Sequence, residues 1–212
     1  MNTDALISLL ATNELPVRAS TGSRLSIALA VGTAGALGLM FALIGVRADL
    51  SEALLIPMFW VKLGFPVSLA AAGFVASSRL ARPGMAPGSV HWAFLVPVLI
   101  IWVLAIRELS GSTSAEREAL VFGETWRDCL IFVSLLSLPA FVAGLWAMRG
   151  LAPTRPRISG AAAGILAGAL AAAAYAFHCP EMQASFLGIW YLLGMLIPSV
   201  AGAIIGPRVL RW

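Results

Sequence analysis

Charged residues are scarce in this chain: 11% of its 212 residues are Asp, Glu, Lys or Arg, and 60% are hydrophobic. A soluble domain is nearer about 25% charged and about 45–50% apolar. This shortage of charge excludes a soluble domain and predicts an integral membrane protein with little mass outside the bilayer. The chain also lacks a phosphate-binding glycine loop, a Ser/His/Asp constellation and a nucleic-acid motif, which argues against the corresponding enzymes and against direct nucleic-acid binding.

Six apolar runs approach the roughly 20 residues that a helix needs to cross the hydrocarbon core. The first is long and has no small-residue cleavage site, so we expect a retained span rather than a signal peptide. The sequence therefore predicts an all-α, polytopic membrane protein built as a six-helix transmembrane bundle. The predicted spans cover residues 25–46, 54–77, 90–106, 129–148, 158–177 and 186–206.

The charge distribution predicts the orientation of these spans. If the N-terminus lies inside, the inner segments carry nine arginines against two acidic residues, and the outer loops carry four arginines against eight acidic residues. Basic residues accumulate on the cytoplasmic side of membrane proteins. We therefore expect both termini to be cytoplasmic, in a bacterial inner membrane.

The chain has only two cysteines, and both fall on the outer side of this topology, which is oxidising in a bacterium. One opens the fourth run and the other follows the fifth, so their Cα atoms are placed to approach the roughly 5.5–6 Å of a disulfide. Three interpretations stay open: a structural disulfide, a reversible redox switch or soft-metal site, and two unrelated thiols. The candidate sensor residues are the two thiols and three neighbours, namely Cys129, Cys179, His178, Glu181 and Trp126.

Thiolates and imidazole suit zinc or copper(I). The metal candidates are therefore Cys129, Cys179 and His178, although the chain has no Cys-x-x-Cys pair. We expect no resident cofactor beyond a transient copper or zinc ion.

Lys62 is the one lysine of the chain, and it lies well inside the second apolar run. An ionisable residue within a span is costly and marks a functional site by default. Two interpretations compete. Lys62 is either such a functional site or a side chain that extends outward to Asp49, Glu52 or lipid headgroups. Pro57, Gly64 and Pro66 indicate an irregular helix whose freed carbonyls are available to accept hydrogen bonds from the ammonium.

The N-terminal segment, residues 1–23, precedes a transmembrane domain of residues 24–212. It opens with leucines at helical spacing, and two or three helical turns are marginal alone in water. We expect this short helix to bury its apolar side in a cytosolic partner or at the membrane interface. The candidate partner-binding residues are Asp4, Leu6, Ile7, Leu9 and Leu10.

Gly160, Gly164 and Gly168 form a small-residue face in the fifth run, and Gly202 and Gly206 repeat the spacing in the sixth. Such faces allow close helix contact. We expect packing between spans of one chain rather than a dimer seam.

A series of short motifs resembles a known family from nearly one end of the chain to the other. The motifs are TDALISLL (3–10), PMFWVK (57–62), WRDC (126–129), LSLPA (136–140), RGLAPTRP (149–156), HCPE (178–181), WYLLG (190–194) and GPR (206–208). Taken in order, they make the sequence similar to NrsF-type anti-sigma factors, which are six-span bacterial inner-membrane proteins. One departure is Leu130, where the family pattern has proline after the cysteine.

The resemblance implies an anti-sigma factor that sequesters an extracytoplasmic-function sigma factor at the membrane and releases it on metal or oxidant stress. It also implies that the two outer cysteines take part in sensing. Two alternatives remain. A small transporter or channel would need polar residues along several spans, and a membrane thiol oxidoreductase would usually carry a Cys-x-x-Cys pair.

Overall fold

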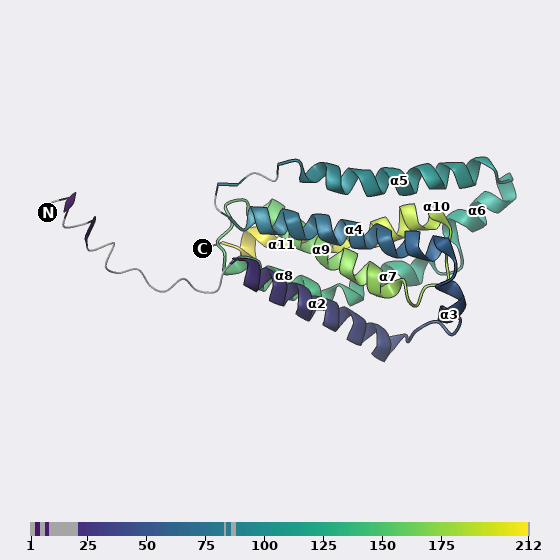
Figure 1. Ribbon diagram of the computed structural model, residues 1–212, viewed down its shortest axis with the longest axis horizontal. Helices are drawn as coiled ribbons and strands as arrows, with labels where there is room; N and C mark the ends of the chain where they lie inside the picture. Colours follow the sequence, from purple (N-terminus) through teal and green to yellow (C-terminus); the bar gives the residue numbers. More distant parts are fainter. Residues whose placement is uncertain (1–2, 5–6, 9–20, 83, 86–87, 212) are drawn as a thin grey trace.

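The computed structural model describes residues 3–4, 7–8, 21–82, 84–85 and 88–211, which form helices and turns and no strand (Figure 1). The long and short helices are α2 (Thr21–Leu43), α3 (Leu50–Ala53), α4 (Pro57–Leu80), α5 (Val90–Ser110), α6 (Ser114–Phe122), α7 (Trp126–Leu136), α8 (Leu138–Arg149), α9 (Pro156–Tyr175), α10 (Ala184–Phe186), the π-helix η1 (Leu187–Tyr191) and α11 (Leu192–Val209).

Within the described residues, six helical stretches are long and apolar enough to cross a membrane. They are Gly22–Leu43, Pro57–Leu80, Val90–Ser110, Ser114–Arg149, Pro156–Tyr175 and Ala184–Val209. Each one coincides with an apolar run of the sequence. The all-α fold and the six membrane-length helices are therefore confirmed.

Helix α9 is the centre of the bundle, where it contacts α11, α4, α8, α7 and α2. Its sequence is almost entirely alanine and glycine between Ser159 and Tyr175, so neighbouring helices can approach it closely on every side. Helix α5, in contrast, contacts α4, α10 and η1 and runs along one side of the molecule (Figure 1). The bundle is thus built around the fifth span, and the third span is peripheral.

Glycines bring the backbones of α9 and α11 into contact. A Cβ atom added at Gly160 would overlap the carbonyl group of Gly202, and one added at Gly164 would overlap the carbonyl group of Pro198. One added at Gly206 would overlap the carbonyl oxygen of Pro156. The two small-residue faces therefore meet within one chain, which confirms the packing role expected for them.

Two of the predicted spans are less regular than expected. The fourth is divided into α7 and α8 at Ser137, where Pro139 at the start of α8 cannot donate a backbone hydrogen bond to the preceding turn. The sixth starts as the short α10 and the π-helix η1 before α11 begins. A further difference is one of length: the third span, α5, ends at Ser110 and not at the predicted Ile106.

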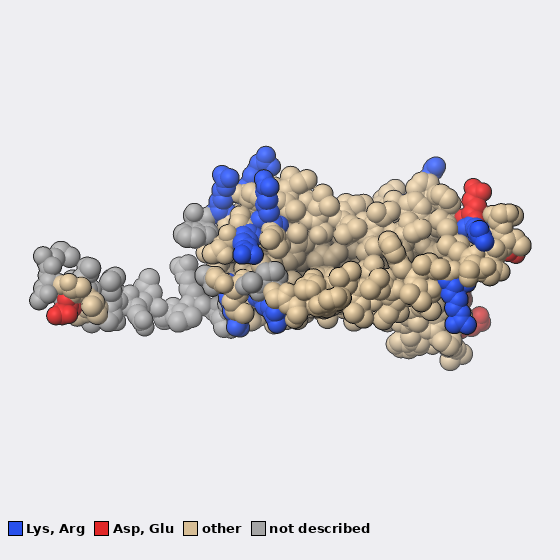
Figure 2. Space-filling model, turned by 90° about the horizontal axis from the view of Figure 1, so that it is seen from above, with Lys and Arg blue, Asp and Glu red and all other residues tan. Residues whose placement is uncertain are grey.

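The two ends of the bundle differ in charge (Figure 2). At one end, α4, α8 and α11 finish and α2, α5 and α9 begin, and arginines mark these termini; we name it the arginine end (Figures 1 and 2). At the other end, which we name the cysteine end, α9 finishes, α7 begins and acidic side chains appear (Figure 2). The first span starts and the last span finishes at the arginine end. The arginines of the inner segments therefore gather at one end of the bundle, as the sequence predicted (Figure 2).

Candidate functional site

The two cysteines belong to one buried cluster at the cysteine end. Cys129 lies in the first turn of α7, and Cys179 lies in the loop after α9, where its N–H donates to the carbonyl of Tyr175 at 3.0 Å. Both are free thiols with no exposed surface, and both pack in the same hydrophobic cluster. The two cysteines, which the sequence placed to approach each other, therefore belong to one cluster.

Lys62 reaches the same place from α4, and it is fully buried. Its Nζ donates to the carbonyl oxygen of Glu181 at 2.8 Å and to the carbonyl oxygen of Cys179. The expectations for how the Lys62 ammonium is held were wrong, whereas its role as a functional site stays a prediction. Its side chain does not extend to water or headgroups, and the carbonyls that hold it come from the loop after α9, while α4 continues through Pro66 as a regular helix.

The connection between α2 and α3 holds the cysteine loop from a second side. The backbone N–H of Arg47 donates to the carbonyl of Phe177 at 3.1 Å, and its Nη1 donates to that of Cys179 at 3.3 Å. The Nδ1 of His178 donates to the carbonyl of Gly45 at 3.0 Å. The carbonyl oxygen of Cys179 therefore accepts hydrogen bonds from two cationic side chains.

Asp49 fixes the guanidinium of Arg47 through an ion pair of 2.6 Å. The hydrogen bond from Arg47 lowers the pKa of the Asp49 carboxyl to about 2, and the same bond raises the pKa of Arg47. The pair is thus charged over the whole physiological pH range. Sequence analysis assigned no role to Arg47, because a lone arginine in a short outer loop carries no local signal.

Glu181 joins the cysteine loop to the start of the helix that carries the other thiol. Its Oε1 accepts from the backbone N–H of Glu124 at 2.8 Å and from Oγ1 of Thr125 at 3.3 Å. Gly123 makes room for it: its φ is +54°, and a Cβ there would lie 2.7 Å from the carboxylate. Glu181 therefore acts as a clamp between the two cysteine-bearing segments.

Two tyrosines complete the surroundings of the thiols. Tyr191, in η1, is fully buried, and its ring centroid lies 5.9 Å from Nζ of Lys62. Tyr175, in the last turn of α9, lies with its ring centroid 6.1 Å from that of Tyr191. Both pack in the same hydrophobic cluster as Cys129 and Cys179. The sequence analysis missed both tyrosines as site residues, although they are the only two tyrosines of the chain.

Trp126 lies apart from this hydrogen-bonded network. Its ring lies tilted against that of Trp190 with the centroids 4.7 Å apart and meets the ring of Phe122 edge-on at 6.0 Å, and the guanidinium of Arg127 lies 4.9 Å from it. The Nε1 of Trp190 donates to the carbonyl of Val121 at 2.7 Å. Trp126 thus joins α6, α7 and η1 and is a structural neighbour of the site.

Within the described residues, no three His, Cys, Asp or Glu side chains gather as they would to hold a metal ion. His178, the third donor considered from the sequence, donates to Gly45, and Glu181 is engaged by the α6–α7 turn. Metal capture by Cys129 and Cys179 therefore stays a prediction, and it would need further ligands from outside this group.

The predicted partner-binding helix is described only at four positions. Thr3, Asp4, Ile7 and Ser8 are helical and exposed, with 58% of Ile7 accessible. Leu6, Leu9 and Leu10 lie outside the described residues. The binding role of this segment stays a prediction.

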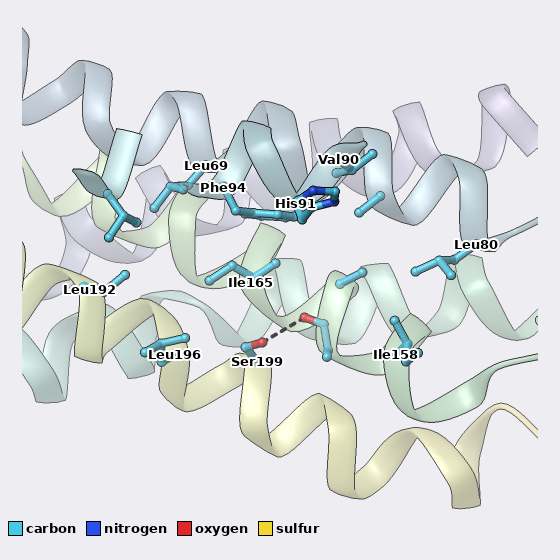
Figure 3. A pocket seen from close by; sticks show the side chains of 14 residues that line it. Leu69, Leu80, Val90, His91, Phe94, Ile158, Ile165, Leu192, Leu196 and Ser199 are labelled. Carbon is cyan, nitrogen blue, oxygen red and sulfur yellow. Dashed lines mark hydrogen bonds between the residues drawn. The ribbon is translucent and has the colours of Figure 1, made fainter. Parts of the chain in front are cut away.

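An apolar groove of about 390 Å³ lies nearer the arginine end, where α5 diverges from the bundle (Figure 3). Side chains of α4, α5, α9 and α11 line it, among them Leu80, Phe94, Ile165 and Leu196. Its polar lining is limited: His91 stands at the start of α5, and Ser199 donates to the carbonyl of Ala161 at 3.1 Å. Neither the thiols nor Lys62 line it, so the groove is separate from the cysteine site.

The chain is similar to a defined protein family over nearly all of its length. The family model NrsF, described as negative regulator of sigma F, matches residues 10–212. A protein of Azospira oryzae named probable anti-sigma-F factor NrsF is 49% identical over 213 residues, and the match covers 100% of both chains. The anti-sigma-F factor NrsF of Caulobacter vibrioides is 37% identical over 222 residues, again with 100% of both chains covered. No solved structure matches the chain.

Proposed function

The chain belongs to the NrsF family, the negative regulators of sigma F, and from this premise we propose that it is an anti-sigma factor. Full-length similarity to two relatives that bear this name is the observation that carries the proposal. The family is regulatory rather than catalytic. The proposed partner is a cytoplasmic sigma factor of the extracytoplasmic-function type, as the sequence resemblance implied.

The proposed location is a bacterial inner membrane, with the arginine end in the cytoplasm. The excess of arginine at that end agrees with the distribution of basic residues in membrane proteins (Figure 2). The N-terminal segment precedes α2, which begins at the same end, so this orientation gives residues 1–23 access to a cytoplasmic partner.

The proposed sensor is the pair Cys129 and Cys179, which would face the envelope. An envelope oxidant that accepts two electrons while the two thiols lose two protons would join them in a disulfide. Because Glu181 and Lys62 link the Cys179 loop to α7 and α4, a change at the thiols would move elements that cross the bundle. A switch from 1:99 to 99:1 between two packings needs about 5.5 kcal/mol. A disulfide or a thiolate–metal site can supply energies of that order.

Deletion of residues 2–12 tests the partner-binding role. We expect sigma-dependent transcription to become constitutive while the protein stays at normal abundance in the membrane. The point variant Leu6→Asp/Leu10→Asp should have the same effect, and the matched variant Asn2→Asp/Thr12→Asp should still repress. Unchanged repression by the deletion variant would contradict the proposal.

The cysteines are tested by Cys129→Ser and Cys179→Ser. Each variant should repress normally without stress and should fail to release the sigma factor when cells are exposed to an oxidant or a soft metal ion. Ser137→Ala serves as a control within the same span. Full induction of both cysteine variants would show that sensing lies elsewhere.

The structure supplies no observation that favours the two alternatives. A transporter needs a polar path, and the groove between α4, α5, α9 and α11 is lined almost wholly by apolar side chains (Figure 3). A thiol oxidoreductase usually carries a Cys-x-x-Cys pair, and the two cysteines of this chain are 50 positions apart.

A further inference from the structure

A second concave site lies at the arginine end, on the side of the bundle formed by α9 and α11. It has a volume of about 620 Å³ and is lined by three arginines and three apolar residues: Arg157, Arg208, Arg211, Ala203, Ile204 and Pro207. Arg157 comes from the first turn of α9, Arg208 from the last turn of α11, and Arg211 from the residues after it. Three guanidinium groups therefore surround one hollow.

The frame that holds these arginines is rigid. Gly160 meets Gly202 and Gly206 meets Pro156 with no room for a Cβ between the two backbones, directly beside the hollow. The distance between Arg157 on one helix and Arg208 on the other is thus fixed by backbone contact. The backbone positions that carry the two arginines are therefore set before a ligand binds, while the arginine side chains themselves are exposed.

The hollow is suited to an anion. No acidic side chain lines it. The first-turn N–H groups of α9, a helix of 20 residues, point toward this end and carry the positive end of the helix dipole. Planar guanidinium groups bind phosphate oxygens in pairs. A phosphate group is therefore the ligand chemistry that matches this site.

An apolar strip continues from the hollow along the exposed face of α11. Ile204, Val200 and Ile197 follow one another at helical spacing, and 60%, 56% and 47% of their surfaces are accessible. Because these residues belong to a helix long and apolar enough to cross a membrane, a lipid acyl chain is the neighbour that would cover the strip, which a soluble phosphate compound would not do. The charged hollow and the apolar strip together fit one amphipathic molecule that lies parallel to the helix.

We propose that Arg157, Arg208 and Arg211 bind the phosphate headgroup of an anionic phospholipid, whose acyl chain lies along Ile204, Val200 and Ile197. Basic pockets between transmembrane helices on the cytoplasmic side commonly hold anionic headgroups. The site lies on different elements from the thiols and does not depend on the proposed anti-sigma role.

The test is native mass spectrometry of the full chain in detergent, titrated with dioleoyl phosphatidylglycerol. The variant Arg157→Gln/Arg208→Gln should bind about 30-fold more weakly, because each arginine beside an anionic headgroup contributes about fivefold. The matched control Arg82→Gln/Arg149→Gln removes the same charge from the same end and should bind like the unaltered chain. Dioleoyl phosphatidylcholine and glycerol 3-phosphate should both bind weakly.

Several outcomes would overturn the proposal. Equal losses in the two double variants would mean that diffuse charge attracts the lipid, and no loss in either would mean that the hollow is not the site. If phosphatidylcholine binds as tightly as phosphatidylglycerol, the net charge of the headgroup does not determine binding. If glycerol 3-phosphate binds tightly, the ligand is a soluble phosphate compound. If Arg157→Gln/Arg208→Gln loses sigma-factor binding and keeps the lipid, the hollow is a protein contact.

Discussion

Lys62 is a buried cation whose partners are peptide carbonyls. Its ammonium group has three N–H donors, and two of them meet the carbonyl oxygens of Cys179 and Glu181. The loop that supplies those carbonyls follows no helical pattern, so its buried backbone groups need partners from elsewhere. Lys62 therefore stabilises the cysteine loop by satisfying the backbone that the loop itself leaves unpaired.

Replacement of Lys62 by methionine should loosen this loop. Methionine keeps most of the volume and removes the donors, so two buried carbonyls are left without the ammonium, and we expect a loss of about 2 kcal/mol in unfolding free energy. The measurement is denaturant unfolding of the chain in detergent. Arg82→Met, an exposed change in the connection after α4, should leave stability unchanged; equal stability of both variants would show that the ammonium contributes nothing to the loop.

Gly123 is the residue that admits the carboxylate of Glu181. With φ at +54° and no space for a Cβ, Gly123→Ala should lower the unfolding free energy by about 1–3 kcal/mol. Gly111→Ala is the matched control, because Gly111 ends α5 at φ −85° and its Cβ would meet no atom closer than 3.8 Å. A thermal melt of the two variants side by side distinguishes the effects, and equal melting temperatures would contradict the clamp.

At the scale of the helices, the sequence predicted where the six spans lie better than it predicted which of them are interrupted. Apolar length and charge bias are local properties, so all six spans could be located from composition alone. Proline did not reveal which span is interrupted: α4, α5 and α11 continue through Pro66, Pro97 and Pro198, whereas α7 and α8 separate at Ser137. Pro139 follows the break directly, but the three uninterrupted helices show that a proline in an apolar run does not by itself predict an interruption.

The candidate site could be predicted only in part for the same reason. The cysteines and Glu181 stand out because such residues are rare in an apolar chain. The contact between Lys62 and the cysteine loop joins residues 117 positions apart, and no local pattern marks it. Tyr191 is directed to the thiols by a π-helix, which has no distinct signal in the sequence.

The contact between α9 and α11 should not tolerate a larger residue. Gly164→Leu places a side chain against the carbonyl of Pro198, and we expect a loss of about 3 kcal/mol or more, or failure to fold. Gly38→Leu in α2 is the matched control, since a Cβ at Gly38 meets nothing within 4 Å. The monodisperse fraction on size-exclusion chromatography reports the difference, and normal behaviour of Gly164→Leu would refute the close contact.

Across the whole molecule, the two ends differ in both charge and chemistry. The native thiols are poor reporters of which end faces the envelope, because neither has exposed surface. Glu118 in α6 and Thr154 between α8 and α9 are exposed and lie at opposite ends of the bundle. These two positions are suited to a test of which end of the bundle faces the envelope.

Single cysteines at these positions in a Cys129→Ala/Cys179→Ala background should react differently with a membrane-impermeant maleimide. In intact cells with a permeable outer membrane, Glu118→Cys should be labelled and Thr154→Cys should be protected until the inner membrane is opened. Labelling of Thr154→Cys alone in intact cells would reverse the proposed orientation, and the anti-sigma role of residues 1–23 would fail with it.

The bond between Lys62 and the loop after α9 also bears on biogenesis. The second span leaves the ribosome long before the residue that Lys62 will contact, 117 positions later. A lysine at the centre of a transmembrane helix costs about 2.5–3.5 kcal/mol, and Lys62, in the second turn of α4, carries part of this cost while it lacks its partners. The early half of the nascent protein is thus an unfinished insertion intermediate, and arrival of the fifth span is the step that completes it.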